Sequence, residues 1–302
     1  MPSQACQAGS WGCLLESHFR AWLVVAVAVA SAAAAPVHAE RDKYSGAPLP
    51  PDKKHTVPSP ITDHFYVEGA FFSPKVTTTL RVDNSTNVGF IGSVVSAEDD
   101  LGLKSHVNQG RIELMFRMRE RNKLRVTYYE LDRSGQKALN RTIQFGDQTF
   151  LVTDIASSSL DWRMFALTYS YELLHFERFE AGLGIGVYLM QGEAQGQVLA
   201  KQQRQEISGV APYPTAALDA TWRISRRFAL TGRAQYLDAT INNFSGAFGD
   251  YHFDLQYRWT PNFTLGAGYS RFALSMGISG GSFPGLLNLN VRGPEGFFRF
   301  SF

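Results

Sequence analysis

The 302-residue sequence predicts an all-β protein, an antiparallel transmembrane barrel of about ten strands. Three observations lead to this prediction. Apolar and polar residues alternate along many segments of the chain, and the composition is rich in residues that favour strands and tight turns, with 27 Gly, 22 Phe and 12 Tyr. The mean hydropathy of −0.15 is also too low for a bundle of apolar membrane helices.

The alternation is clearest in residues 250–259 (DYHFDLQYRW), where aromatic or aliphatic residues take every second position and polar residues the others. It recurs in 110–119, 178–189 and 217–223. A period of two places the two sets on opposite faces of a strand. A soluble β-sandwich or barrel is the alternative, but here the apolar face carries Tyr, Trp and Phe near the strand ends, which is typical of membrane barrels.

Short charged turns alternate with longer polar connections between these segments. The turns are 119–122, 175–178, 225–227 and 260–262, and the longer loops are 84–106, 133–157, 200–208, 239–249 and 279–286. The strands predicted between them are 64–83, 107–118, 123–132, 158–173, 179–199, 209–223, 228–238, 250–259, 263–278 and 287–302. An even number of strands places both chain ends on the short-turn side, the periplasm.

Two other strand counts are compatible with the sequence. Eight strands would result if the first long segment, or the region around 141–160, is only loop. Twelve would need the second loop (FGDQTFLVTD, within 133–157) to form its own hairpin.

The N-terminal region predicts export. Residues 1–39 read as a secretory signal peptide, because Arg20 precedes an apolar run at 21–35 and a small-x-small sequence ends at Ala39. The run is shorter than the roughly 20 residues of a comfortable membrane span. Both cysteines, Cys6 and Cys13, belong to this segment, so we expect the mature chain to contain no disulfide, cysteine nucleophile or thiolate metal site.

Residues 40–62 contain five Pro and many charges, which predicts a flexible periplasmic leader. The domain organisation is therefore a signal peptide at 1–39, the leader at 40–62 and the barrel at 63–302. With 29 Lys and Arg against 27 Asp and Glu, the charge balance gives no basis for binding nucleic acid.

The C-terminal sequence GFFRFSF alternates the aromatic residues Phe298, Phe300 and Phe302 with Arg299 and Ser301. A last strand of this kind, with a terminal Phe, resembles the assembly signal of Gram-negative outer-membrane proteins. In that family the barrel-assembly machinery reads the last strand by strand pairing.

Three stretches, 96–103 (SAEDDLGL), 121–135 (RNKLRVTYYELDRSG) and 257–274 (YRWTPNFTLGAGYSRFAL), resemble a set of proteobacterial outer-membrane proteins of unassigned function. The segment 64–302 as a whole looks like a small barrel of the OmpA/OmpW-like kind. The resemblance implies a location in the Gram-negative outer membrane. It implies contact with membrane lipid and lipopolysaccharide, and with the assembly machinery and periplasmic chaperones during biogenesis. We expect no cofactor; the sequence leaves the oligomeric state open, with a monomer as the expectation.

The inward faces of the predicted strands carry acids and bases in near balance, and buried charges are costly unless they are paired. We therefore expect a lumen charge network of Arg111, Glu113, Arg117, Arg125, Glu172, Glu180, Asp219, Arg223, Arg233, Asp254, Arg258 and Arg299. Eight strands give a filled interior and sixteen an open channel, so a ten-stranded barrel leaves a narrow passage for small solutes as an alternative. Gly182, Gly184 and Gly186 leave one inner wall bare and could form a cleft.

Asp250, His252 and Asp254 form the sharpest catalytic candidate. Their spacing places all three on the lumen face, at the extracellular end of the predicted strand 250–259. A His between carboxylates could activate water, and the pattern resembles in outline the Asp/His site of omptin proteases. Pairing of Asp254 with Arg233 and Arg258 explains the charges without catalysis. We therefore predict no enzymatic activity, with a surface hydrolase as the alternative.

Glu98, Asp99 and Asp100 could hold Ca²⁺, although a solvated acidic loop is the simpler interpretation, and we predict no metal site. The sequence thus predicts an outer-membrane barrel with a structural or surface-interaction role.

Overall fold

The computed structural model describes residues 60–83, 92–145, 148–152, 155–198, 203–241, 244–278 and 285–302. The predicted signal peptide and most of the predicted leader lie outside these ranges. The strands are β1 (Phe65–Phe72), β2 (Lys75–Val82), β3 (Val95–Ser96), β4 (Gln109–Arg119), β5 (Asn122–Ala138), β6 (Ile143–Phe145), β7 (Gln148–Phe150), β8 (Ile155–His175), β9 (Phe179–Val198), β10 (Gln203–Arg223), β11 (Phe228–Ile241), β12 (Phe244–Thr260), β13 (Phe263–Ile278) and β14 (Gly285–Ser301). No helix that could span a membrane occurs among the described residues.

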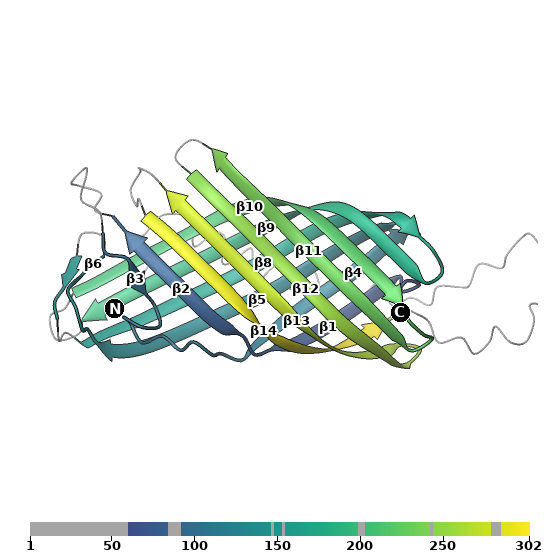
Figure 1. Cartoon of the computed structure of the whole chain (residues 1–302), viewed down its shortest axis with the longest axis horizontal. Coiled ribbons are helices and arrows are strands. Elements are labelled where there is room, and N and C mark those ends of the chain that lie inside the picture. The colour runs from purple at the N-terminus through teal and green to yellow at the C-terminus, as the bar shows by residue number, and fades with distance from the viewer. Residues whose placement is uncertain are drawn as a thin grey trace, which may run out of the picture. The chain divides into compact units, whose positions relative to one another are not determined.

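The long strands close into a ten-stranded antiparallel barrel (Figure 1). Each pairs with the next in the chain, and β1 closes the ring by pairing with both β4 and β14. β1 and β2 act as one position of the barrel, because β14 pairs with β1 through its second half and with β2 through its first. The ten-strand prediction is confirmed.

The break between β1 and β2 has a local cause. Pro74 lies opposite Gly293 and Pro294 lies opposite Ser73 at this point, and neither proline has the N–H group that would continue the ladder. The two strands also approach closely here, since a Cβ on Gly293 would lie 2.7 Å from the Ser73 carbonyl oxygen. The first predicted strand, 64–83, is therefore one crossing of the barrel with an interruption at its middle.

Tight turns join β4 to β5, β8 to β9, β10 to β11 and β12 to β13 at one end of the barrel, which we call the turn end. We call the opposite end the loop end. β4 stops before the loop end, whereas β5 continues towards it. Residues 92–108 fill the resulting space between β2 and the loop-end part of β5. β3 pairs with β2, and Leu103 forms a bridge to Gly135. Gly102 has a φ of 74°, which favours glycine, where this segment turns against β5.

Three of the predicted long loops are wrong in extent, because the strands continue through them. The predicted loop 239–249 consists mostly of β11 and β12, which pair as far as Ile241 and Phe244. The loops 133–157 and 200–208 are shortened in the same way by β5, β8 and β10. Backbone hydrogen bonds between the strands continue beyond the membrane, where the outer face no longer has to be apolar. The alternation of apolar and polar residues therefore ends before the strands do, and the loops were predicted too long.

A small hairpin of β6 and β7 does form inside the predicted loop 133–157, but its two strands make a separate sheet. The twelve-strand alternative is therefore wrong, although it located the hairpin correctly.

The outer and inner faces follow the predicted alternation. Large apolar residues with exposed side chains form a band around the outside, including Ile185 at 71%, Phe253 at 60% and Trp259 at 60%. This exposure on a closed barrel is the lipid-facing surface of a transmembrane barrel. The lumen contains buried charged residues near the turn end and a buried aromatic and aliphatic cluster towards the loop end.

Candidate functional site

Glu113 is the centre of one group of ion pairs in the lumen. Arg233 Nη1 lies 2.7 and 2.6 Å from its two carboxylate oxygens, and Arg125 Nε lies 3.4 Å away. The Tyr66 hydroxyl donates a third contact at 2.6 Å. The four residues come from β1, β4, β5 and β11, so the interaction crosses the lumen between distant parts of the wall.

Lys123 is the centre of a second group. Its Nζ lies 2.6 Å from Glu172, 2.5 Å from Glu180 and 3.4 Å from Asp219. Arg117 contributes a further pair to Glu180 at 3.1 Å. Two cations therefore hold three carboxylates in a space where all five side chains are buried.

Asp63 is the centre of a third group of contacts, at the turn end of the lumen. Asp63, which precedes β1, accepts hydrogen bonds from Arg258 Nη2 at 2.6 Å and from the Ser301 hydroxyl at 2.8 Å. Arg117 Nε donates to the Asp63 carbonyl oxygen at 3.2 Å. Ile61 beside it is only 4% exposed, so the last residues of the predicted leader enter the turn end of the lumen.

Arg299 and Arg111 connect these groups to β14. Arg299 donates to Glu68 through Nε at 2.9 Å and Nη2 at 2.6 Å, and its guanidinium lies 4.1 Å from the centre of the Tyr66 ring. Arg111 Nη1 lies 2.9 Å from Glu295.

The structure places the predicted network residues in the lumen, with one at its edge. Arg223 pairs at 3.0 Å with Glu177, whose side chain is 88% exposed in a turn. The lumen also contains Glu68, Lys123 and Glu295, which were not predicted although each occupies an inward position of a predicted strand. Asp63 was not predicted either, because it lies just ahead of the first predicted strand, where no alternation marks it.

Asp250, His252 and Asp254 have different partners in the lumen. His252 Nε2 lies 3.0 Å from Asp250, and its Nδ1 lies 3.2 Å from Glu295 on β14. Asp254 instead lies 3.7 Å from Arg233. Arg111 Nη1 also lies 3.0 Å from His252 Nδ1, so both ring nitrogens already have polar partners.

The three residues also lie away from the barrel rim. Because β12 begins at Phe244, Asp250 is inside the barrel wall, and the predicted position at the extracellular end of a strand is wrong. The error arose from residues 244–249, whose Gly and Ser residues suggested a loop but which pair with β11 and β13.

Aromatic rings cover Asp250 and His252 on the loop-end side. Phe248 contacts the rings of Tyr188 and Phe272 at centroid distances of 4.5 and 5.4 Å, and the Tyr188 hydroxyl donates to Asp250 at 2.7 Å. Beneath the rings, a cavity of about 40 Å³ is lined by residues that include Tyr129 and His252. A space of this size suits one or two water molecules rather than a substrate.

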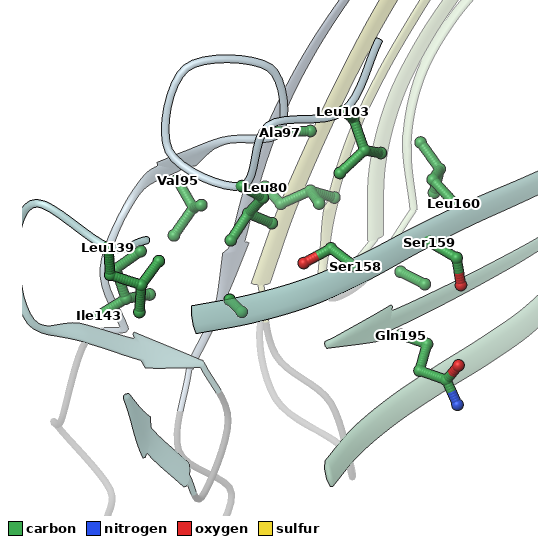
Figure 2. A pocket seen from close by; sticks show the side chains of 13 residues that line it. Leu80, Val95, Ala97, Leu103, Leu139, Ile143, Ser158, Ser159, Leu160 and Gln195 are labelled. Atoms are coloured by element: carbon green, nitrogen blue, oxygen red, sulfur yellow. The ribbon is translucent and has the colours of Figure 1, made fainter. Parts of the chain in front are cut away.

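A second apolar cluster lies at the loop end (Figure 2). Leu80, Val95 and Leu103 from one side pack near Ile143 and Leu160 from the other. The cavity among them measures about 30 Å³. Residues 92–108 and the segment leading to β6 thus meet over this end of the lumen.

The acidic residues of this loop make internal contacts. Glu98 pairs with Arg133 at 2.6 Å, and Asp100 pairs with Arg141 at 2.7 Å and accepts the Ser96 amide at 2.9 Å. The hydrogen bond from Arg141 lowers the pKa of Asp100 below its usual value. In the ranges that the structure describes, no group of three or more His, Cys, Asp or Glu side chains is placed to hold a metal ion.

No protein-family model matches the sequence, and no curated protein shows significant similarity to it. Solved structures do match. The outer membrane protease OmpT from Escherichia coli has a TM-score of 0.50 at 12% identity, over 82% of this chain and 99% of OmpT. Ail of Yersinia pestis has a TM-score of 0.34 at 8% identity, over 77% and 98% of the two chains. An outer membrane channel from Pseudomonas putida F1 has 0.37 at 10% identity, over 82% and 98%.

At 12% identity the likeness to OmpT shows the fold alone. The chain has the fold of an outer-membrane β-barrel, and its closed wall and apolar outer band place it in the Gram-negative outer membrane. The turn end is accordingly periplasmic and the loop end extracellular.

Proposed function

We propose that this outer-membrane β-barrel is a closed, non-enzymatic protein with a structural and surface-interaction role in the cell envelope. The observation that carries the proposal is the filling of the lumen by side chains at successive levels. Buried ion pairs occupy the periplasmic half, and an aromatic and aliphatic cluster follows towards the extracellular end. The second apolar cluster lies beneath the extracellular loops.

Such a lumen favours a plug over a narrow passage. A passing ion would have to separate pairs such as Arg258 with Asp63 and Arg299 with Glu68, whose side chains are at most 4% exposed. It would then have to cross the aromatic cluster around Phe248 without polar partners. Both steps are costly for a charged solute.

The geometry of His252 argues against the hydrolase alternative. A general base needs a free nitrogen facing the water that it activates, whereas His252 Nε2 contacts Asp250 and its Nδ1 contacts both Glu295 and Arg111. The ring is also covered by aromatic residues on the side from which an extracellular substrate would arrive. The likeness to OmpT extends to the fold and does not supply a catalytic group here.

The extracellular end offers the surface for interaction. Residues 92–108 are fastened to the wall by the ion pairs of Glu98 and Asp100, so the loop presents a defined surface. The exposed side chains there are mostly polar or charged, which suits contact with other envelope components.

Two measurements test the proposal on the purified full chain. Planar-bilayer recordings should show no discrete openings, and reproducible conductance steps would contradict the closed lumen. Hydrolysis of peptide and lipid ester substrates should stay at the detergent background for both the wild type and His252→Ala. Turnover by the wild type that His252→Ala abolishes would instead establish the hydrolase.

A further inference from the structure

Four basic residues form one row across the outer wall of the barrel. They are His106, Lys75, Arg292 and Arg271, and each lies directly opposite the next on neighbouring segments. All four are exposed. Figure 1 shows β2, β14 and β13, which carry three of them, side by side on one wall of the barrel.

This arrangement is unfavourable for the protein alone. Residues directly opposite in an antiparallel pair have Cβ atoms only about 5 Å apart, and like charges there repel. In the described part of the chain, Lys75, Arg271 and Arg292 form no ion pair with a carboxylate. The arginines of the lumen network, in contrast, have carboxylate partners, as Arg299 does with Glu68.

The row also has a defined height on the wall. Tyr269, the next outward residue on β13, lies immediately to its periplasmic side, and Phe71 and Phe298 lie further towards the turn end; all three are exposed side chains of the lipid-facing band. On its extracellular side the outward residues become polar, as at Thr77 and Asn290. The row therefore marks the boundary between the hydrocarbon and the head groups of the outer leaflet.

We propose that His106, Lys75, Arg292 and Arg271 bind the phosphate groups of a phosphorylated glycolipid in the outer leaflet of the membrane. The two guanidinium groups match phosphate oxygens bidentately, and Lys75 adds a compact third charge. With strands about 4.8 Å apart, the three cations on β2, β14 and β13 span roughly 10 Å, enough to engage two neighbouring phosphates. An anion in this position would also relieve the repulsion along the row.

The inference depends on the outer-membrane fold and not on the closed lumen, so it and the function proposed above can fail separately. The test is native mass spectrometry of the full chain in detergent micelles, titrated with bis-phosphorylated lipid A and with lipid A from which both phosphates have been removed. The wild type should retain the phosphorylated lipid more tightly. The triple variant Lys75→Gln, Arg271→Gln, Arg292→Gln should lose affinity by roughly 5-fold for each cation removed and should bind both lipids equally.

Matched variants separate a specific site from a general charge effect. Arg119→Gln, Arg121→Gln, Arg226→Gln removes the same charge from exposed residues at the periplasmic turns and should leave lipid binding unchanged. Arg271→Lys with Arg292→Lys keeps the charge and should retain most of the affinity. Heat-dependent migration on gels will verify that each variant is folded.

Three results would overturn the proposal. One is equal retention of phosphorylated lipid A by the wild type and the triple Gln variant. Another is an equal loss of affinity in the variant at the periplasmic turns. The third is full displacement of the lipid by millimolar inorganic phosphate, because that would identify a site for free phosphate instead of a lipid head group.

Discussion

Arg233 Nη1 contacts both carboxylate oxygens of Glu113, at 2.7 and 2.6 Å, although 120 residues separate the two in the sequence. Glu113 also accepts from Tyr66 and lies 3.4 Å from Arg125. All of these groups are buried, so the carboxylate is the shared partner of two arginines that have little access to water. The stability of the barrel should therefore depend on this one acid.

We expect Glu113→Ala to lower the free energy of unfolding by about 3–5 kcal/mol, because it removes the carboxylate partner of buried Arg125 and leaves Arg233 with only the more distant Asp254, at 3.7 Å. Guanidinium unfolding of the barrel in lipid vesicles, followed by tryptophan fluorescence, would measure it. Arg119→Ala at an exposed turn should change the value by less than about 0.5 kcal/mol. Glu113→Leu combined with Arg233→Met should cost less than Glu113→Ala alone, and a larger loss in the double variant would contradict the pairing.

Asp63 should control the periplasmic end of the lumen. Asp63→Ala removes the carboxylate partner of Arg258, whose side chain is 1% exposed, and releases the Ser301 hydroxyl. We expect a loss of about 3–5 kcal/mol in the free energy of unfolding, for the same reason as above. Arg258→Leu together with Asp63→Ala should restore part of the loss. An unchanged unfolding midpoint in Asp63→Ala would show that the pair does not hold this segment in place.

Gly135 should be essential for the fit of residues 92–108 against β5. A Cβ at this position would lie 2.2 Å from the Gly102 carbonyl oxygen, a contact that requires the backbone to move. Gly135→Ala should therefore cost about 1–3 kcal/mol and expose the loop to protease while the barrel remains folded. Limited proteolysis with mass mapping of the fragments would detect it. Gly110→Ala is the matched control, because a Cβ there meets nothing within 4 Å, and equal cleavage of both variants would refute the close contact.

The alternation of side chains was enough to predict the ten crossings and the two faces of each strand. Lipid imposes this pattern directly, because every second residue of a spanning segment must be apolar. The same constraint weakens beyond the hydrocarbon, which is why residues 244–249 were assigned to a loop although they belong to β12. The fold could be predicted from local pattern, but the full strand lengths could not.

The partners in the lumen could not be predicted, because they depend on the stagger between strands and on contacts across the barrel. Asp254 was expected between Arg233 and Arg258. It does lie 3.7 Å from Arg233, but Arg258 instead reaches Asp63, a residue 195 positions away. Glu295 approaches His252 from β14, a strand that is not adjacent to β12. Which acid meets which base is therefore a property of the closed barrel.

Acid should loosen the extracellular loop through Asp100. Its pKa is lowered by the hydrogen bond from Arg141, so the ionised form stabilises the folded loop. This contribution is fully present above the pKa of about 3.9 of an Asp in the unfolded chain and is lost as the pH falls through the lower folded pKa. Amide hydrogen exchange, corrected for intrinsic rates, should show protection of residues 96–103 falling below about pH 4, starting with the Ser96 amide that donates to Asp100. Asp100→Asn should be less protected at neutral pH and should show no such fall, and a wild-type profile in that variant would assign the acid response to another group.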